Sequence, residues 1–521
     1  MNQFGWPPSV RATTPRAAAR AIVIGAGPVG QTTALLLARW GLAVELLDAA
    51  PRRDAVGSKS ICQQRDVLDI WSAVGAPDIA AEGLTWTTAR TFYRDREIHR
   101  WSFAPTTGTP PFVNISQTRT EHHLDRAIAR QPRIRVTFDA RATAITDHGT
   151  HPRVRLADGR ALAADYVVAC TGARDGGLRD SLGITFDGTT HPDRFLICDI
   201  AADLPGHAHE RHFHFDPSAN PGRQILIHPC PQDTYRIDWQ VAENYRADRD
   251  DLDARIRAVL GDTPYRLLWN TAYRFHSRIA STLHTGRVLL AGDAAHLCAP
   301  FGARGLNSGI ADAENAAWKI AAHAHGWAAP DILATYHTER HAAARENQSV
   351  VDATMDLLAP TTPQSRHRRR ATLTAAANDP ARAAAIDSGR FAEPYWYDAS
   401  PLTTPDPTRA APGRPPKGQP QPAAPGTITP DTPLPDATPL RQALRGHFTL
   451  LTTQAASHAP PPLRTLTLTP ATAETIGMRP NETWLVRPDA HLAATLTTPT
   501  PDDVTAALRR AVARHPAPQP R

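Results

Sequence analysis

The sequence predicts an α/β protein with three parts: a domain built on a parallel sheet, a mostly antiparallel sheet inserted into it, and a small C-terminal domain. Three observations support this. A strand, a glycine turn, a helix and a second strand follow one another over residues 21–48. Residues 181–284 contain many short strands with alternating apolar and polar side chains, which is typical of an antiparallel sheet. Strand and helix patterns resume at 441–521 after a proline-rich stretch.

The composition is that of a globular protein and excludes several other classes. Of the 521 residues, 41% are hydrophobic and 21% are charged, which rules out wholesale disorder. The net charge of +6 is too small to argue for nucleic-acid binding. No stretch reaches the roughly 18–20 uncharged apolar residues that span a bilayer. The five cysteines form no CxxC pair, so we expect a cytoplasmic protein without a metal site. From the charge and the lack of a long apolar stretch, we expect neither nucleic-acid nor membrane partners.

The first ordered elements form a dinucleotide-binding motif. Residues 1–19 are expected to be a flexible arm, because they have no apolar core of the signal-peptide type. A strand at 21–24 then leads into Gly25-Ala26-Gly27-Pro28-Val29-Gly30 and a helix. In a Rossmann-like domain Gly25 permits the tight turn, Gly27 lets the backbone approach a pyrophosphate, and Gly30 allows close packing. Asp48 ends the second strand and is the expected partner of ribose hydroxyls. Alone, this motif indicates either NAD or FAD.

The later elements follow in the same way. Two strands around a charged turn at 94–96 predict a hairpin between Trp86 and Trp101. Strands are expected at 133–138, 154–156, 166–169 and 287–291, and helices at 307–324 and 332–358. The arginine-rich run at 366–370 is interpreted as a solvated helix face or loop. Residues 401–440 include 13 prolines in 40 positions, which predicts an extended linker or a wrapping arm.

Two further motifs narrow the choice of cofactor. The segment 170–176, which contains Asp175, follows a predicted strand. Gly292-Asp293 ends another strand and leads through Pro300 into the turn that holds Gly305-Leu306-Asn307. A carboxylate at the end of a central strand is well placed to bind the ribityl chain of a flavin. The helix that begins at this turn would direct its positive end at the flavin ring.

These motifs, in this order, resemble those of the group A flavoprotein aromatic hydroxylases, the para-hydroxybenzoate hydroxylase-like monooxygenases. The resemblance covers about residues 20–400. The segment 113–124 and the added C-terminal domain are most similar to the 3-(3-hydroxyphenyl)propionate and phenol hydroxylase-like members. The resemblance implies a glutathione reductase type FAD-binding domain (20–85, 112–180 and 285–330) and a substrate domain (86–111 and 181–284). A helical segment (331–400), a linker (401–440) and a thioredoxin-like domain without CxxC (441–521) would follow.

The resemblance also implies a set of cofactor-binding residues. The ADP half of FAD would contact Gly25, Ala26, Gly27, Pro28, Val29, Gly30 and Asp48, with Gln117 near the ribityl chain and pyrophosphate. Asp175 would serve both FAD and the nicotinamide nucleotide. Gly292 and Asp293 would hold the ribityl chain, and Pro300, Gly305, Leu306 and Asn307 would line the isoalloxazine ring. FAD would be non-covalent, because no Cys or His attachment motif is evident.

The implied reaction is hydroxylation of an aromatic, usually phenolic, small molecule. NAD(P)H would reduce FAD, and O2 would then form a flavin C4a-hydroperoxide that delivers one oxygen atom to the ring. Three alternatives stay open: a non-catalytic FAD-binding or assembly protein, a flavin-dependent halogenase, and a NAD-dependent dehydrogenase. A homodimer is also compatible with the sequence.

The catalytic and substrate-binding residues are not specified by these motifs. The candidates in the inserted sheet are His214, His228, Tyr235, Arg236, Asp238 and Trp239. Residues 235, 237 and 239 face one side of their strand, and 236, 238 and 240 face the other. The alternation does not say which side meets the flavin. His296 is expected to pack or to form a local hydrogen bond.

Overall fold

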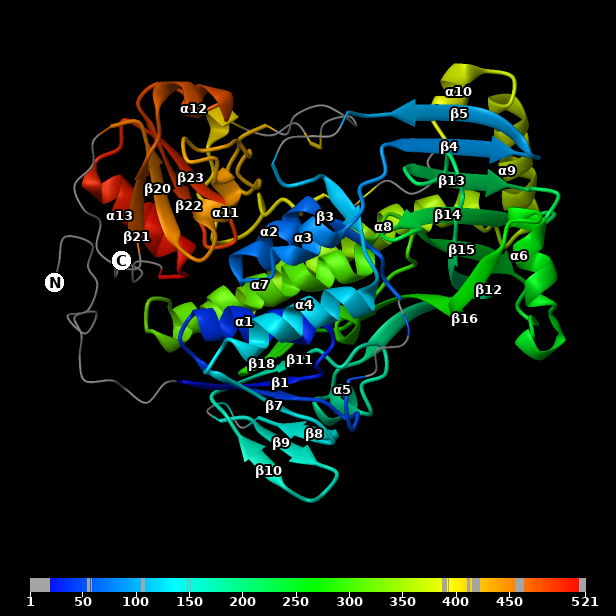
Figure 1. Cartoon of the computed structure of the whole chain (residues 1–521). Helices are drawn as coiled ribbons and strands as arrows, with labels where there is room; N and C mark the ends of the chain where they lie inside the picture. Colours follow the sequence, from blue (N-terminus) through cyan, green and yellow to red (C-terminus); the bar gives the residue numbers. More distant parts are fainter. Residues whose placement is uncertain are drawn as a thin grey trace.

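The computed structural model describes residues 19–514, apart from 54–56, 58, 105–107, 148, 150, 387–390, 392, 410–412, 415–421 and 455–462. Almost all of the expected N-terminal arm, 1–19, therefore lies outside the described residues. Three units adjoin one another (Figure 1): a parallel sheet with its helices, an eight-stranded sheet, and a C-terminal unit. The eight-stranded sheet and the C-terminal unit lie on opposite sides of the helices that cover the parallel sheet.

The parallel sheet has the strand order β17-β18-β11-β1-β2-β7, and only the β17–β18 pair is antiparallel. Its strands are β1 (Arg20–Ile24), β2 (Ala43–Leu47), β7 (Ile134–Thr137), β11 (Tyr166–Ala169), β17 (His284–Thr285) and β18 (Val288–Leu290). Apart from Arg20 and Glu45, the residues of the inner strands are apolar, because both faces of the sheet are covered. The helices α1 (Pro28–Arg39), α4 (Gln117–Ala129) and α7 (Arg304–Ala324) cover one face (Figure 1). A three-stranded sheet adjoins the other, with β8 (Ala142–Thr146), β9 (Arg153–Leu156) and β10 (Ala161–Ala163).

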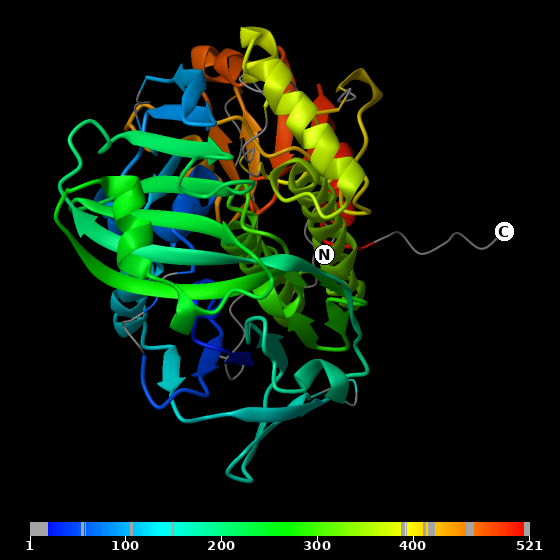
Figure 2. The same ribbon diagram turned by 90° about the vertical axis from the view of Figure 1, so that its right-hand side faces the viewer.

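The eight-stranded sheet has the order β19-β16-β12-β15-β14-β13-β4-β5, and every pair except β13–β4 is antiparallel. Its strands are β4 (Thr88–Tyr93), β5 (Arg96–Ser102), β12 (Phe186–Ala202), β13 (Glu210–Phe215), β14 (Gln224–Cys230), β15 (Thr234–Val241), β16 (Tyr265–Ala280) and β19 (His296–Leu297). The predicted hairpin is confirmed, because Arg94 and Asp95 form its turn with φ of 48° and 64°. Helix α6 (Leu252–Leu260), which the sequence analysis did not predict, lies on the outer face of this sheet (Figure 2).

The remaining helices connect or cover these sheets. They are α2 (Arg65–Ala73), α3 (Asp78–Glu82), α5 (Leu178–Ser181), α8 (Ala334–Leu358), α9 (Pro363–Ala376) and α10 (Pro380–Ala384). A two-stranded ribbon pairs β3 (Cys62–Gln64) with β6 (Phe112–Asn114). Helices α7 and α8 confirm the two long helices that the sequence predicts.

The interpretation of the arginine-rich run as a fully solvated face is wrong for one residue. The run lies on α9, and four of its five residues are exposed. Arg369 is buried, its guanidinium lies 5.7 Å from the ring centroid of Phe215, and its Nη1 donates to the carbonyl of Gly222 at 3.1 Å. This arginine anchors α9 to the eight-stranded sheet, because its side chain has both an aromatic face and a carbonyl to bind.

The C-terminal unit is a four-stranded sheet in the order β21-β20-β22-β23. It contains β20 (Phe448–Thr452), β21 (Leu463–Thr467), β22 (Glu482–Val486), β23 (Leu492–Thr497), α11 (Leu440–Leu444), α12 (Pro470–Thr475) and α13 (Pro501–Ala511). The β20–β21 pair is parallel and the other two pairs are antiparallel. Ile428 and Leu440 share a buried cluster with Leu451 and Trp484, so the described end of the proline-rich segment packs into this unit.

Buried ion pairs join the C-terminal unit to the helices of the parallel sheet. Arg487 donates from Nη1 and Nη2 to the two carboxylate oxygens of Glu339 on α8, at 2.6 and 2.9 Å. Lys319 on α7 donates to the same carboxylate at 2.7 Å. All three side chains are at most 1% exposed. In a second cluster of ion pairs, Arg445 of the C-terminal unit binds Glu314 on α7 and Asp66 on α2.

The described residues were also searched for membrane spans and metal sites. No helix among them is both long enough and apolar enough to cross a bilayer. No group of three or more His, Cys, Asp or Glu side chains in the described part of the chain is arranged to hold a metal ion. All five cysteines are free thiols.

Candidate cofactor and substrate site

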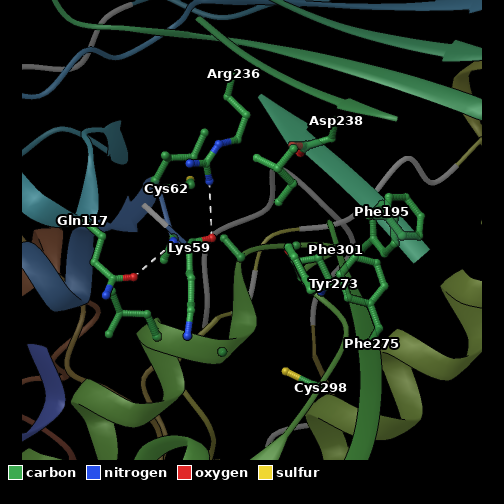
Figure 3. A pocket seen from close by; sticks show the side chains of 18 of the residues that line it. Lys59, Cys62, Gln117, Phe195, Arg236, Asp238, Tyr273, Phe275, Cys298 and Phe301 are labelled. Carbon is green, nitrogen blue, oxygen red and sulfur yellow. Dashed lines mark hydrogen bonds between the residues drawn. The ribbon is translucent and has the colours of Figure 1, made fainter. Parts of the chain in front are cut away.

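A single large cavity extends from the glycine turn after β1 to the inner face of the eight-stranded sheet. Its volume is about 1770 Å³. Pockets for one small ligand typically measure roughly 300–1,000 Å³. The cavity therefore has room for a large cofactor and for a second molecule beside it. Figure 3 shows some of the side chains that line it.

The glycine turn forms one end of the cavity. A Cβ on Gly25 would lie 2.4 Å from the carbonyl oxygen of Cys170, and a Cβ on Gly30 would lie 1.8 Å from that of Gly25. These two glycines are needed for close packing, as the sequence predicts. A Cβ on Gly27 would meet no atom within 4 Å, and Gly27 lines the cavity. Open space thus lies at the N-terminus of α1, where free N–H groups favour phosphate.

Asp48 stands beside this turn at the end of β2. Its Oδ2 accepts the N–H of Ala26 at 2.7 Å, and its Oδ1 accepts the N–H of Ala50 at 2.8 Å. The side chain lines the cavity. Because each carboxylate oxygen has further lone-pair capacity, Asp48 can hold the turn and still accept ribose hydroxyls.

Gln117 and Asp293 line the middle of the cavity. Gln117, the first residue of α4, accepts the N–H of Ser60 at 3.2 Å through Oε1 and donates to Glu121 at 2.9 Å through Nε2. Asp293 lies in the 3-10 turn Gly292–Ala294 that follows β18. Its side chain is exposed and lines the cavity; the protein around it raises its pKa by desolvation, while His296 and Lys59 favour the charged form. An acceptor of this kind suits a neighbouring hydroxyl group.

A buried aspartate fixes the position of the Gly292–Asp293 turn. Asp312 on α7 accepts the N–H of Gly292 at 3.0 Å, the Nε2 of His296 at 2.7 Å and the Nε of Arg340 at 2.7 Å. Burial alone would raise the pKa of Asp312, but His296 and Arg340 together lower it to about 2. The prediction that His296 forms a local hydrogen bond is confirmed.

The eight-stranded sheet forms the far end of the cavity, and the structure decides which face of β15 it presents. Arg236 and Asp238 line the cavity, whereas Tyr235, Ile237 and Trp239 are buried with Ile256 of α6 on the opposite face. Other lining residues on strands of this sheet include Arg211, Leu226, His228, Ile197 and Thr271. Of the six candidates from the sequence, His228, Arg236 and Asp238 therefore face the cavity. His214 stacks on Phe92 with ring centroids 4.4 Å apart and does not line it.

The polar groups on this face differ in their partners. Arg236 forms a two-point ion pair with Asp199, at 2.8 and 2.9 Å. Burial lowers the pKa of His228 well below its usual value, and Arg211 and Arg236 reinforce this, so the ring is neutral. Burial raises the pKa of Asp238 to about 7, opposed by Arg236 and reinforced by Asp199.

Aromatic side chains wall the same end of the cavity. Phe195 and Phe275 stack with ring centroids 4.4 Å apart, and Phe301 packs edge-on against both. Tyr273 lies 5.0 Å from Phe275, and all four residues line the cavity (Figure 3). A flat apolar molecule would find ring faces and edges to pack against here.

Comparison with known proteins identifies the family. A family described as the FAD binding domain matches residues 18–351. The chain belongs to this family. One relative is a 3-(3-hydroxy-phenyl)propionate/3-hydroxycinnamic acid hydroxylase of Mycolicibacterium gilvum, 30% identical over 335 residues, which are 62% of this chain and 57% of the relative. Another, a 3-(3-hydroxy-phenyl)propionate/3-hydroxycinnamic acid hydroxylase 2 of Burkholderia vietnamiensis, is 29% identical over 360 residues, which are 65% of this chain and 63% of the relative. The match thus spans less than two thirds of either relative.

Solved structures show the same fold. The flavin-dependent monooxygenase PieE, in complex with FAD and substrate, superposes with a TM-score of 0.80 at 20% identity, over 96% of this chain and 100% of PieE. The rebeccamycin biosynthetic enzyme RebC, with reduced flavin, superposes with a TM-score of 0.73 at 23% identity, over 96% and 100%. At these identities the likeness concerns the fold, which is that of FAD-binding flavoprotein monooxygenases.

FAD is the cofactor of the family, and the residues of the cavity fit it. The open space at Gly27 suits a pyrophosphate, and the carboxylates of Asp48 and Asp293 suit ribose and ribityl hydroxyls. Thr171 lines the cavity between them, and its buried Oγ1 has no hydrogen-bond partner among the described residues. A bound cofactor would supply the missing partner.

Not all residues that the sequence assigns to FAD line this cavity. Those that do are Gly25, Gly27, Pro28, Val29, Asp48, Gln117, Asp293, Pro300, Gly305 and Leu306. The other five, Ala26, Gly30, Asp175, Gly292 and Asn307, lie behind its wall. Asp175 accepts the N–H of Arg179, the second residue of α5, at 2.7 Å. The Oδ1 of Asn307 accepts the N–H of Gln64 at 2.9 Å, and its Nδ2 donates to the carbonyl of Cys62 at 3.0 Å. For all the residues that the sequence assigns to FAD, contact with the cofactor stays a prediction.

Sequence reasoning missed most of the substrate end. Phe195, Trp269, Tyr273 and Phe301 were not candidates, although all four line the cavity. Alternation along 194–200 and 269–275 places the first three of these side chains on one face, but it cannot tell that face from the one under α6. The lining residues 384–386, at and after the end of α10, carried no signal at all.

Proposed function

We propose that the protein is an FAD-dependent monooxygenase that hydroxylates an aromatic, phenolic substrate and consumes NAD(P)H and O2. The observation that carries this proposal is the continuity of the cavity: the FAD-binding turn and an aromatic-walled pocket belong to one space. FAD, when bound, supplies hydride acceptance and oxygen activation. The relatives named as hydroxyphenylpropionate hydroxylases support the choice of substrate class.

The residues of the chain position the two molecules and keep water away. Gly27, Asp48 and Asp293 would hold the cofactor along the wall from β1 to β18. The rings of Phe195 and Phe275 would pack against the aromatic substrate. The buried rings of Phe195, Phe275 and Phe301 would exclude water from the side of the substrate that packs on them, which protects a reactive oxygen species from hydrolysis.

We infer a thioredoxin-like topology for the C-terminal unit. In chain order its strands pair as 2-1-3-4, with the first two parallel and the last two antiparallel to their neighbours. Helix α12 separates β21 from β22, and α13 follows β23. No cysteine occurs after Cys298, so this unit serves packing and not redox chemistry.

The test is substrate-stimulated oxidation of NAD(P)H by the purified, FAD-loaded protein. A panel of phenols and larger hydroxylated aromatics would be screened, with oxygen uptake and product mass recorded together. We expect at least one compound to speed NAD(P)H oxidation and to gain 16 mass units. Tight FAD binding without stimulation or product by any compound would favour the non-catalytic alternative. A halogenated product in the presence of halide would favour a halogenase.

A further inference from the structure

Asp238 lies on the face of the eight-stranded sheet that forms the far end of the cavity. It lies on β15, directly opposite Ile197 of β12 on one side and Leu226 of β14 on the other. All three residues line the cavity. Directly opposite residues on one face of a sheet are in side-chain contact, so this carboxyl group stands between two aliphatic side chains. Figure 3 shows it beside Arg236, on the side of the cavity that holds Phe195.

Asp238 differs from the other carboxylate nearby in having no partner. Asp199 is held by both arms of Arg236, at 2.8 and 2.9 Å. Among the described residues, no hydrogen bond or ion pair reaches Asp238, and its Oδ1 is fully buried without a donor. A buried polar atom without a partner calls for an explanation, and a ligand that donates a hydrogen bond is one.

The groups around Asp238 leave it as the residue that titrates near neutral pH. The charged and titratable side chains that face this region are Arg236 on β15, Asp199 on β12, His228 on β14, Arg211 on β13 and Tyr273 on β16. The guanidiniums of Arg236 and Arg211 stay positively charged near neutral pH, and that of Arg236 forms an ion pair with Asp199. Burial lowers the pKa of His228 and raises that of Tyr273, so both are neutral. The pKa of Asp238 is raised to about 7, chiefly because of burial.

We propose that Asp238 binds a phenolic hydroxyl of the substrate and accepts its proton. This inference rests on the proposed function, because it assigns a residue to the substrate of that site. The aromatic wall of Phe195, Tyr273 and Phe275 lies on the same side of the cavity, so a ring packed there can present its hydroxyl to the carboxylate (Figure 3). The large volume admits a substrate with more than one ring.

The proton transfer balances without a further reactant. The substrate O–H bond breaks, an O–H bond forms on Asp238, and the electron pair of the broken bond stays on the phenolic oxygen. The resulting phenolate pushes electron density into the ring, which favours attack by the ring on electrophilic oxygen. After hydroxylation the proton returns from Asp238 to the oxygen of the product. The carboxylate is then ready for another substrate molecule.

The experiment measures binding selectivity, which does not depend on turnover. The FAD-loaded protein would be titrated with 1-naphthol and with 1-methoxynaphthalene by calorimetry between pH 5.5 and 8.5. An ionised carboxylate can only accept, so it favours the hydroxyl and disfavours the ether oxygen, whereas a protonated carboxyl can donate to either. We therefore expect the preference for 1-naphthol to rise through about pH 7 and to reach about ten- to hundredfold at pH 8.

Two variants and one control complete the design. Asp238→Asn should abolish the rise with pH and most of the preference for the hydroxyl. Asp238→Leu matches the aliphatic neighbours, so it should fold and give the same loss even if the amide is poorly tolerated. The control Asp233→Asn neutralises an exposed carboxylate in the turn before β15, outside the cavity, and should leave both the preference and its pH dependence unchanged.

The outcomes separate this inference from the proposed function. A preference for 1-naphthol that persists at all pH values in both Asp238 variants would overturn the assignment, and so would a flat pH profile in the wild type. Neither result would bear on FAD binding, which is followed in parallel by the flavin spectrum. Conversely, a protein that binds naphthol through Asp238 but forms no hydroxylated product from any compound of the panel would refute the proposed function and leave the binding role of Asp238 intact.

Discussion

Replacement of Arg487 by methionine should strongly destabilise the contact between the C-terminal unit and the helices of the parallel sheet. The guanidinium is fully buried and forms four hydrogen bonds, two to Glu339 and two to Asp489 at 2.6 and 3.1 Å. Methionine fills a similar volume but leaves both carboxylates short of a cation. Removing one partner of a buried ion pair typically costs about 3–5 kcal/mol. We expect a value near 3 kcal/mol, because Lys319 still binds Glu339.

The pH dependence of this loss follows from the pKa of Glu339. Burial alone would raise this pKa, but Arg487 and Lys319 together lower it below the usual 4.5. In the wild type the pair therefore contributes its full stability above about pH 4.5, and the contribution is lost as the pH falls further. In Arg487→Met, burial prevails and the pKa rises, so protonation relieves part of the cost on the way from pH 7.5 to 5. The difference between the two proteins should shrink over that range.

Urea unfolding monitored by tryptophan fluorescence measures the effect at both pH values. The control is Arg257→Met, which breaks the ion pair between Arg257 and Asp253 on the exposed face of α6. Exposed pairs contribute little, so this variant should unfold like the wild type. If Arg487→Met loses less than about 1 kcal/mol, or loses the same amount at pH 5 and 7.5, the buried pairs do not hold the C-terminal unit in place.

Three further predictions concern the cofactor. Gly30→Ala should prevent correct folding, because its Cβ would lie 1.8 Å from a carbonyl oxygen. Gly27→Ala should fold but lose FAD. Circular dichroism measures the folding of both variants, and the flavin spectrum measures their FAD content. Asp293→Ala should weaken FAD binding about tenfold or more, since unpaired hydroxyls cost about 1–3 kcal/mol; a fluorescence titration that matches the wild type would contradict this role. Acid or heat should release intact FAD from the yellow protein, and flavin that stays with the precipitate would disprove non-covalent binding.

The cofactor end of the site could be predicted from the sequence because local rules specify it. A strand that leads into Gly25, followed by open space at Gly27 two positions later and by tight packing at Gly30 five positions later, admits few alternatives. The position of Asp48 relative to this turn follows from the parallel pairing of β1 with β2. Asp175 and Asn307 also belong to motifs, but a motif does not reveal which of its members point inward. Their side chains bind backbone groups behind the wall, a choice that depends on α5 and on the ribbon β3–β6.

The substrate end depends on contacts between distant segments, which no local pattern encodes. The alternation along β15 separates Asp238 from Trp239 but leaves the two faces equivalent. Helix α6 breaks this equivalence: Ile256 packs on the face that carries Ile237 and Trp239. The opposite face must then meet the FAD-binding domain, and the carboxyl of Asp238 is buried there among aliphatic side chains. The side of the sheet that α6 covers thus determines that the carboxyl of Asp238 faces the cavity. The amphipathic pattern of α6 is weak and lies within a strand-rich region, which explains why this helix was not predicted.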